Sequence, residues 1–173
     1  MKQVKLFLSD VDGCMTNGGL YYTEDEREVK RFCVYDGMGM VLLRKQGIPC
    51  GILTSEINNI VKMRARKLNL DYLYMGVGRV IDDKSISKLE AAKEICAKMG
   101  ITLEDVCFVG DDVNDLELLQ HVGTPVCPAN AQPAVKAVPG IIVLEHRGGD
   151  GAIREICDKI LVEKQGVVLH KKQ

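Results

Sequence analysis

The sequence contains no tryptophan, and aromatic residues make up only 5% of its 173 positions. Proteins bind single-stranded nucleic acids by stacking bases on aromatic side chains, so this chain lacks the residues for such a surface. Basic residues are not in excess either, because 23 Lys and Arg stand against 24 Asp and Glu. Together these features argue against a protein that binds nucleic acids.

The sequence also lacks any apolar run that approaches the roughly 20 residues of a membrane-spanning helix. Its first apolar stretch ends at Ser9-Asp10 and is too short for a signal peptide. The seven cysteines are irregularly spaced without a CxxC pair, which does not favour a disulfide framework or a zinc site. We therefore expect a cytoplasmic protein without membrane contacts, in which most cysteines are small buried hydrophobic residues.

A length of 173 residues with 46% hydrophobic content suits one compact domain with a buried core. Apolar runs alternate with helical patterns, which predicts an α/β fold with a doubly wound, mainly parallel sheet. We expect a single domain over residues 1–173, with a β-hairpin inserted at residues 18–34. Strands are predicted at residues 4–8, 48–53, 72–75, 106–109, 125–127 and 141–144. Helices are predicted at residues 38–46, 87–99, 113–121 and 152–164, and one more follows Thr54 and ends at Leu68.

Acidic side chains follow three of the predicted strands at the points where these end. They are Asp10 and Asp12, then Glu56, and finally Asp111, Asp112 and Asp115. In an open parallel sheet the carboxyl ends of the strands meet at one edge, where ligands bind. Carboxylates that converge there repel one another unless a cation lies between them, and oxygen ligands without His or Cys favour Mg²⁺. The alternative, that these residues only form turns and helix caps, suits one such cluster better than three.

The positions of these groups suit the transfer of a phosphoryl group. A carboxylate beside Mg²⁺ can attack phosphorus as a nucleophile. Asp12 lies two residues after Asp10, on the same side of an extended chain, and can act as acid and then as base. Thr54 is predicted at the N-terminus of a helix, where backbone N–H groups and the helix dipole favour phosphate.

A cation that contacts the phosphoryl group is also required, and two lysines are candidates. Lys84 lies in a predicted loop. Lys88 lies in the first turn of a helix, directly after a capping box formed by Ser87 and Glu90. A lysine opposes the helix dipole at that position, so Lys88 needs another reason to be there. We favour Lys88 over Lys84 for this role.

The helix that ends at Leu68 carries charged residues of interest. Arg64 falls within its apolar stripe and needs a partner. We interpret it as an anion clamp or a subunit contact, the alternative being a side chain that reaches over the domain edge. Glu56 and Lys67 project from nearly the same side, about 16 Å apart at 1.5 Å per residue. An elongated substrate would reach both, and two independent surface charges are the alternative.

Four short stretches resemble the four motifs of the haloacid dehalogenase superfamily of phosphatases: Asp10-Val11-Asp12-Gly13, Leu53-Thr54-Ser55, Lys88 and Gly110-Asp111-Asp112. Residues 12–39, 61–64 and 148–155 are similar to the capless sugar-acid phosphatases, so the resemblance covers nearly the whole chain. Members of this family act on 3-deoxy-D-manno-octulosonate 8-phosphate and on nonulosonate 9-phosphates. The resemblance implies a haloacid dehalogenase-like α/β fold without a cap domain.

The resemblance also implies roles for the acidic residues. Asp10 would be the nucleophile that forms an aspartyl-phosphate, and Asp12 would be the general acid and base. The carboxylates of Asp10 and Asp111, with the backbone carbonyl of Asp12, would hold Mg²⁺. Asp112 and Asp115 would support these metal ligands.

Further implied roles concern the substrate and the assembly. Thr54 and Lys88 would bind the phosphoryl group. We predict contacts with the rest of the substrate for Ser55, Glu56, Arg64 and Lys67. The family forms homotetramers in which the hairpins meet centrally and a neighbouring subunit closes each active site, and residues 18–34 would be that hairpin. Whether the C-terminal residues 167–170 enter a neighbouring site is left open.

The residues after the second strand bear on the substrate. Octulosonate enzymes of the family usually carry Thr-Gly-Arg there, whereas this chain has Thr54-Ser55-Glu56. Glu56 together with Lys67 is similar to the nonulosonate branch, which includes the 2-keto-3-deoxynononate enzyme. We therefore expect Mg²⁺-dependent hydrolysis of a nonulosonate 9-phosphate, such as that of 2-keto-3-deoxynononate or N-acylneuraminate, for lipopolysaccharide or capsule synthesis.

Two alternatives to this function stay open. In the first, the substrate is the octulosonate 8-phosphate of lipopolysaccharide synthesis. In the second, the chain is a non-catalytic oligomerisation module, related to those fused to sugar-acid cytidylyltransferases. Degraded motifs would favour such a module, but Asp10, Asp12, Thr54, Lys88 and Asp111 are all present.

Overall fold

A computed structural model of the protein describes residues 3–79 and 86–165. Its main sheet has six strands in the order β5-β4-β1-β6-β7-β8, and each neighbouring pair is parallel. The strands are β1 (Leu6–Ser9), β4 (Cys50–Thr54), β5 (Tyr72–Met75), β6 (Val106–Val109), β7 (Thr124–Cys127) and β8 (Ile142–Val143). This doubly wound order confirms the predicted fold class. Lys84 and residues 167–170 lie outside the described residues.

The central strand β1 decides where a ligand can bind. All four of its residues are buried, as expected for a parallel strand with helices on both faces. β4 and β6 flank it, with Leu8 opposite Gly51 on one side and Phe108 on the other. The strand order reverses at this point, so the carboxyl ends of β1, β4 and β6 border the crevice where such sheets bind ligands.

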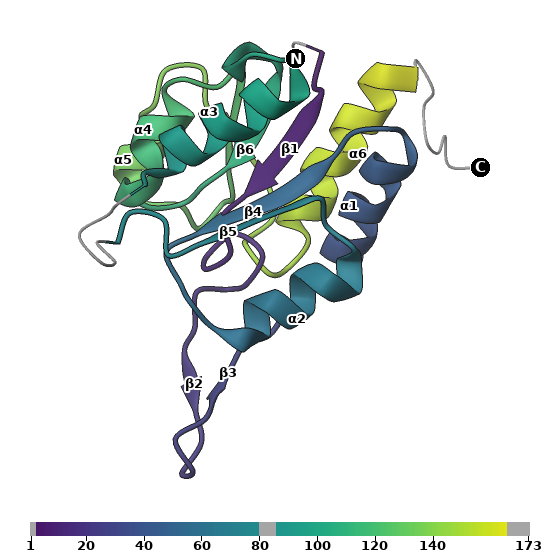
Figure 1. The fold of residues 1–173 in the computed structure, drawn as a ribbon. Coiled ribbons are helices and arrows are strands. Elements are labelled where there is room, and N and C mark those ends of the chain that lie inside the picture. The colour runs from purple at the N-terminus through teal and green to yellow at the C-terminus, as the bar shows by residue number, and fades with distance from the viewer. Residues whose placement is uncertain (1–2, 80–85, 166–173) are drawn as a thin grey trace.

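Helices cover both faces of the sheet and bury two hydrophobic cores (Figure 1). One face packs against α1 (Val34–Lys45), α2 (Asn59–Leu68) and α6 (Ala152–Gln165). The other face packs against α3 (Lys88–Met99), α4 (Leu116–Leu119) and α5 (Pro133–Lys136). Two 3₁₀ turns, η1 (Leu103–Asp105) and η2 (Val113–Asp115), precede β6 and α4.

The start of α2 differs from the prediction. The helix begins at Asn59, because the Asn58 side chain caps it by accepting a hydrogen bond from the Val61 N–H. Thr54 is the last residue of β4, and its hydroxyl accepts a bond from the Glu56 N–H in a local turn. The expectation that Thr54 lies at a helix N-terminus is therefore wrong.

The boundaries of the other helices lie closer to the predicted ones. α3 begins after Ser87, and the predicted capping box between Ser87 and Glu90 is present. α1 starts at Val34 rather than at Met38, so the helix takes over the last residue of the predicted hairpin. The predicted helix over residues 113–121 is a 3₁₀ turn followed by a single α-helical turn. The short α5 was not predicted, since one turn of helix carries no periodicity.

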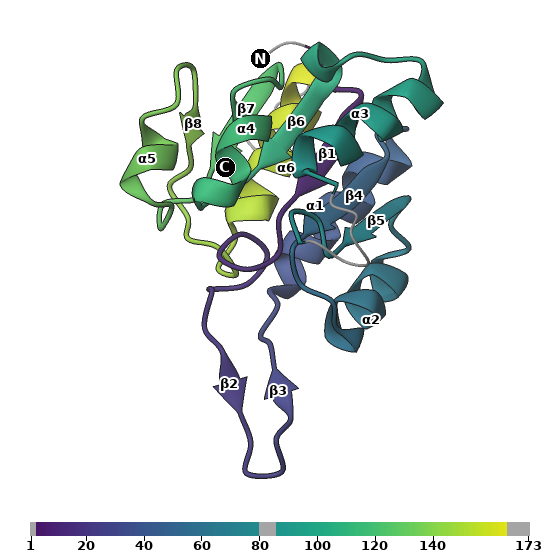
Figure 2. The same cartoon turned by 60° about the vertical axis from the view of Figure 1, so that its left-hand side comes forward.

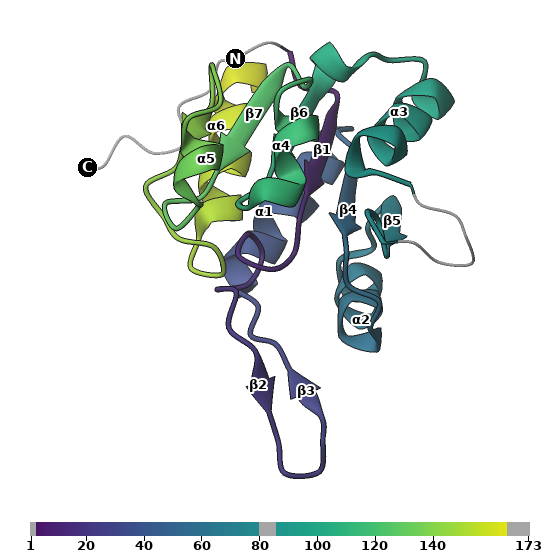
Figure 3. The same ribbon diagram turned by 90° about the vertical axis from the view of Figure 1, so that its left-hand side faces the viewer.

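The predicted hairpin is confirmed as an antiparallel pair, β2 (Tyr21–Tyr22) and β3 (Glu28–Val29). It extends away from the sheet and its helices in all three views (Figures 1, 2 and 3). Leu20, Tyr21, Tyr22 and Val29 are exposed on it. Two strands alone are marginally stable in water, so these apolar side chains require an explanation.

The loop after β1 is held by the segment before α6. Asn130 donates a hydrogen bond to the Gly13 carbonyl at 2.9 Å and accepts one from the Gly148 N–H at 2.6 Å. A Cβ at Gly148 would lie 1.8 Å from the Gly13 carbonyl oxygen, so a side chain there would displace the loop. The Gly-Gly-Asp-Gly stretch thus positions the residues that follow β1.

The structure also bears on the cysteines and on membrane-spanning helices. The seven cysteines are free thiols, and all except Cys33 are buried, which confirms that most serve as small core residues. Among the described residues, no helix combines the length and the apolar character of a membrane span.

Glu155 fastens the segment before Gly148 to α6. Its carboxylate accepts hydrogen bonds from the N–H groups of Glu145 and His146 at 3.0 and 3.1 Å, and from Lys159 at 2.7 Å. Burial opposes the charge, but these donors lower the pKa of Glu155 to about 2. The carboxylate therefore stabilises the fold in a way that depends on pH.

Replacing Glu155 with Gln should lower the free energy of unfolding by about 1.5–3 kcal/mol at pH 7, the usual value for bonds to a charged group. Because the folded pKa lies below the ordinary value of 4.5, this stabilisation is present above pH 4.5 and is lost as the pH falls toward 2. Urea unfolding at several pH values should show that the difference in the free energy of unfolding between wild type and variant becomes smaller in acid.

The control is Asp158→Asn on the same helix, whose partly exposed pair with Arg154 should contribute less than about 1 kcal/mol. An advantage of wild type over Glu155→Gln that does not change with pH would contradict this account.

Candidate active site

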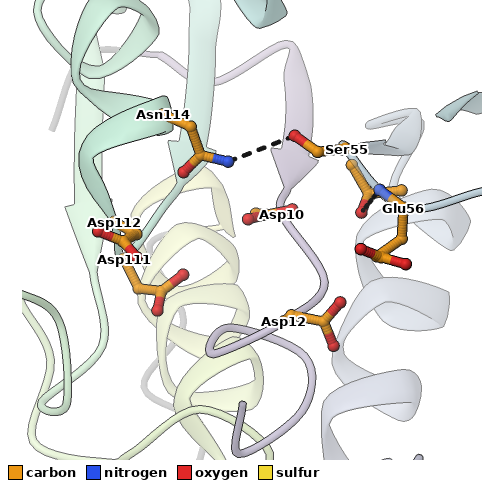
Figure 4. Close-up of a pocket in the computed structure, with 8 residues that line it drawn as sticks. Asp10, Asp12, Ser55, Glu56, Asp111, Asp112 and Asn114 are labelled. Carbon is orange, nitrogen blue, oxygen red and sulfur yellow. Dashed lines mark hydrogen bonds between the residues drawn. The ribbon is translucent and has the colours of Figure 1, made fainter. Parts of the chain in front are cut away.

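A pocket of about 170 Å³ opens at the carboxyl ends of β1, β4 and β6. Its lining consists of Asp10, Asp12, Thr54, Ser55, Glu56, Asp111, Asp112 and Asn114. Figure 4 shows side chains from the three strand ends converging on this space. The structure therefore brings together the strand-end groups that the sequence singles out.

Lys88 lies against the innermost carboxylates of the site. Its Nζ is 3.0 Å from Asp10 Oδ2 and 2.6 Å from Asp115 Oδ1, and all three side chains are at least 91% buried. Burial opposes the charge of Lys88, but Asp10 and Asp115 raise its pKa above the ordinary value. These two carboxylates are the reason for a lysine in the first turn of α3, where the helix dipole opposes it.

Three carboxylates form a cluster that fits a divalent cation. Asp10, Asp111 and Asp115 each offer an oxygen, and these oxygens lie within 4.8 Å of one another. Asp115 is held by Lys88 and by the Asp111 N–H at 2.9 Å, and Asp10 is held by Lys88 and by the Val11 N–H at 2.7 Å, so Asp111 is the more available ligand of the three. Oxygen-only donors suit a hard cation such as Mg²⁺.

The backbone and the charges around Asp111 support this fit. A Cβ on Gly13 would lie 1.9 Å from Asp111 Oδ2, so the carboxylate occupies space that any other residue at position 13 would fill. Gly13 also has a φ of 83°, which favours glycine. Burial and the charge of Asp115 raise the pKa of Asp111 to about 7, and burial is the main cause that raises the pKa of Asp10 to about 7. A bound cation would relieve this crowding of negative charge.

Asp12 lies outside this cluster. Its two carboxylate oxygens each accept a hydrogen bond from Lys30 Nζ at 2.7 Å, and Oδ1 accepts another from the Thr16 hydroxyl at 3.2 Å. Burial opposes the charge of Lys30, but Asp12 and Glu28 raise its pKa. The Asp12 side chain is therefore held by an ammonium group, and a metal contact through its backbone carbonyl stays a prediction. Asp112 is exposed and caps the turn η2 through the Val113 N–H.

The residues after β4 form the opposite wall. Thr54 is buried, and the Ser55 hydroxyl donates to the Val77 carbonyl at 2.9 Å. Asn114 donates to Ser55 Oγ at 3.4 Å and so links the two walls of the pocket (Figure 4). Glu56 accepts a bond from Arg79 at 2.9 Å, so its charge has a partner in the same chain.

Arg64 and Lys67 are not among the pocket-lining residues of this chain. The Arg64 guanidinium donates to the Cys33 carbonyl at 2.8 Å and lies 5.2 Å from the centre of the Phe32 ring, at the base of the hairpin. Lys67 lies exposed in the last turn of α2. Within one chain the structure does not bring these two residues to the pocket, and their contact with substrate stays a prediction.

Three residues near the site escaped the sequence reasoning. Lys30 and Arg79 are single basic residues in polar segments, and nothing in their local sequence indicates a partner. Asn114 lies between candidate metal aspartates, which is the one signal that would have suggested it.

Comparison with known proteins gives a consistent result. A family model described as haloacid dehalogenase-like hydrolase matches residues 55–156. The chain is 32% identical over 162 residues to the 3-deoxy-D-manno-octulosonate 8-phosphate phosphatase KdsC of Salmonella typhi, covering 93% of this chain and 81% of that protein.

Solved structures agree with this match. The 3-deoxy-D-manno-octulosonate 8-phosphate phosphatase of Moraxella catarrhalis, in complex with magnesium, phosphate and KDO, has a TM-score of 0.84 at 33% identity, covering 95% of this chain and 89% of that chain. A putative enzyme of the same name from Vibrio cholerae has a TM-score of 0.86 at 34% identity, covering 98% and 89%. The chain therefore belongs to the haloacid dehalogenase superfamily, in the family of capless sugar-acid phosphatases.

Proposed function

We propose that this protein is a Mg²⁺-dependent phosphatase that hydrolyses the phosphate monoester of a 2-keto-3-deoxy sugar acid through an aspartyl-phosphate. The observation that carries the proposal is the buried contact between Asp10 and Lys88, 3.0 Å apart beside Asp111. The residues that we propose as nucleophile, phosphate-binding cation and metal ligand thus lie together at the carboxyl edge of one sheet, which supports the proposal. A non-catalytic module would have no need to keep this costly group of buried charges.

In the first step a carboxylate oxygen of Asp10 attacks phosphorus. The bond from phosphorus to the sugar oxygen breaks, and Asp12 gives that oxygen a proton. Lys88 balances charge on the phosphoryl oxygens, and Thr54, at the end of β4, contacts them from the opposite wall. The products of this step are the free sugar acid and an aspartyl-phosphate on Asp10.

In the second step water attacks the phosphorus of the aspartyl-phosphate. Asp12, now a carboxylate, takes a proton from that water, and the bond between phosphorus and Asp10 breaks. Inorganic phosphate leaves and both aspartates return to their starting forms. Mg²⁺, held by Asp10 and Asp111, supplies positive charge against the phosphoryl oxygens when it is bound.

Glu56 supports a nonulosonate 9-phosphate as the substrate. Octulosonate enzymes of the family usually carry Arg at this position, and the reversed charge beside the substrate should alter which sugar acid fits. The guanidinium of Arg79, from a different part of the chain, lies 2.9 Å from Glu56 on the same wall of the pocket. Octulosonate 8-phosphate is the second candidate, because that substrate appears in the names of the similar enzymes.

The assembly is part of the proposal. We propose a homotetramer in which the hairpins of residues 18–34 meet and a neighbouring subunit completes each pocket. The exposed apolar side chains of the hairpin and of the start of α1 support this, since large apolar side chains gathered in one region of a surface often mark an interaction site. They are Leu20, Tyr21, Tyr22, Val29, Val34 and Tyr35. Arg64 and Lys67 would then meet substrate across a subunit boundary.

Asp10→Asn should lower kcat by on the order of 10⁴-fold or more, because an amide cannot attack phosphorus. Release of phosphate from each candidate substrate measures the effect, while sedimentation should show the same assembly as wild type. The control is Asp105→Asn, since Asp105 pairs with Lys5 at the opposite end of the sheet. Retained turnover in Asp10→Asn would refute Asp10 as the nucleophile.

Mg²⁺ should raise the melting temperature, because a ligand at a hundredfold its Kd stabilises the native state by about 2.7 kcal/mol. Chelation should abolish turnover, and added Mg²⁺ should restore it. Asp111→Asn should melt higher than wild type in chelator, since one crowded carboxylate is removed, but should gain less from Mg²⁺. An equal gain in the variant and the wild type would mean that Asp111 does not hold the cation.

Glu56→Arg should shift the ratio of kcat/KM toward octulosonate 8-phosphate by about tenfold, equivalent to about 1.4 kcal/mol. The single variant also places two guanidinium groups together, so the double variant Glu56→Arg/Arg79→Glu is the matched control that restores an ion pair. The two variants should favour the same substrate if the charge at position 56 selects it. An unchanged ratio in both would show that this position does not select.

A further inference from the structure

One charged side chain beside the hairpin contacts Asp12, a residue that lines the pocket. Lys30 directly follows β3, and its side chain is fully buried, whereas its neighbour Arg31 is 56% exposed in a pair with Asp150. Burying an ammonium group is unfavourable unless it is paired. Lys30 Nζ meets Asp12 at 2.7 Å and lies 3.2 Å from Glu28 Oε1, so two carboxylates supply that pairing.

The contact restrains both oxygens of Asp12. Oδ1 accepts from Lys30 and from the Thr16 hydroxyl, and Oδ2 accepts from Lys30. A carboxyl group that can otherwise rotate about two side-chain bonds is thereby held in one orientation. If Oδ2 carries a proton, Lys30 can keep its hydrogen bond to Oδ1. Lys30 can therefore orient Asp12 in both protonation states of the carboxyl group.

We propose that Lys30 is a positioning residue that orients the Asp12 carboxyl group for proton transfer with the leaving oxygen, and that Oδ2 is the oxygen that exchanges the proton. This inference rests on the proposed function of Asp12. In the first step the sugar oxygen leaves phosphorus and takes the proton from Oδ2. In the second step Oδ2 takes a proton from the attacking water, so the carboxyl group is restored.

Through Lys30, the hairpin would contribute directly to catalysis. Orientation of a catalytic group contributes strongly to rate, and a displacement on the order of 1 Å lowers it about 10²-fold. The hairpin therefore has a role at the reacting atoms of its own chain, separate from any part in assembly.

Substrates with different leaving groups test the proposal. A sugar acid released from 2-keto-3-deoxynononate 9-phosphate needs a proton on its alkoxide oxygen, whereas the phenolate of p-nitrophenyl phosphate leaves without one. Hydrolysis of the aspartyl-phosphate is common to both substrates, so the first step is compared in single-turnover experiments with enzyme in excess. Lys30→Met should slow release of the free sugar acid about 10–100-fold, since a general acid contributes about 10²–10⁴-fold. It should slow release of p-nitrophenolate less than about threefold, because that step needs no proton.

Two matched variants complete the test. Lys30→Arg should recover much of the lost rate on the sugar phosphate, because it restores a charged donor to Asp12. Arg31→Met, at the next position of the hairpin, should leave both rates near those of wild type. Melting temperature and sedimentation of each variant report on folding and assembly.

The outcomes separate the proposal from its premise. Equal losses in the rate of the first step on both substrates in Lys30→Met, no loss, or a higher rate would overturn the positioning role. Asp12→Asn serves as the reference and should slow this first step far more for the sugar phosphate than for the aryl phosphate. If Asp12→Asn discriminates in this way and Lys30→Met does not, only the role of Lys30 is wrong; if neither discriminates, the proposed function of Asp12 is wrong as well.

Discussion

The ammonium group of Lys88 lies 3.0 Å from Asp10 and 2.6 Å from Asp115, where almost no solvent reaches the three side chains. Charges so deeply buried are tolerated only when each finds a partner. This contact holds the start of α3 against the residue that follows β1 and against the turn η2, and neither of its ion pairs involves the nearby carboxylate of Asp111. The same arrangement that stabilises the edge of the sheet thus prepares a place for a divalent cation.

Other parts of the chain converge on that edge from greater distances. The glycines at 13 and 148 allow two loops to touch, and Asn130 joins them by hydrogen bonds to both. Lys30 reaches back from the hairpin to Asp12, and Arg79 reaches Glu56 from beyond β5. Two carboxylates that line the site, Asp12 and Glu56, are therefore already paired with basic residues of the same chain. A substrate that enters must compete with these pairs, which makes their strength part of specificity.

Local rules predicted much of this structure. The strands β5 and β6 have the predicted bounds, the capping box at Ser87 is present, and Asp10 and Asp111 meet at one edge. These features depend on periodicity, on caps and on the order of strands, which act over a few residues or follow from the fold class. The predicted start of a helix at Thr54 was wrong for an equally local reason, because the Asn58 side chain caps the helix further along the chain.

The sequence by itself determined the doubly wound sheet, its carboxyl edge and the acidic residues that gather there, since alternating apolar runs and strand-end aspartates define these directly. Only the tertiary structure decided which charges become partners. Lys30 pairs with Asp12, Arg64 turns toward Cys33, and Asp115 rather than Asp12 joins the carboxylate cluster. Such contacts join residues far apart in the chain, and they depend on the paths of loops and on burial, which no spacing in the sequence encodes.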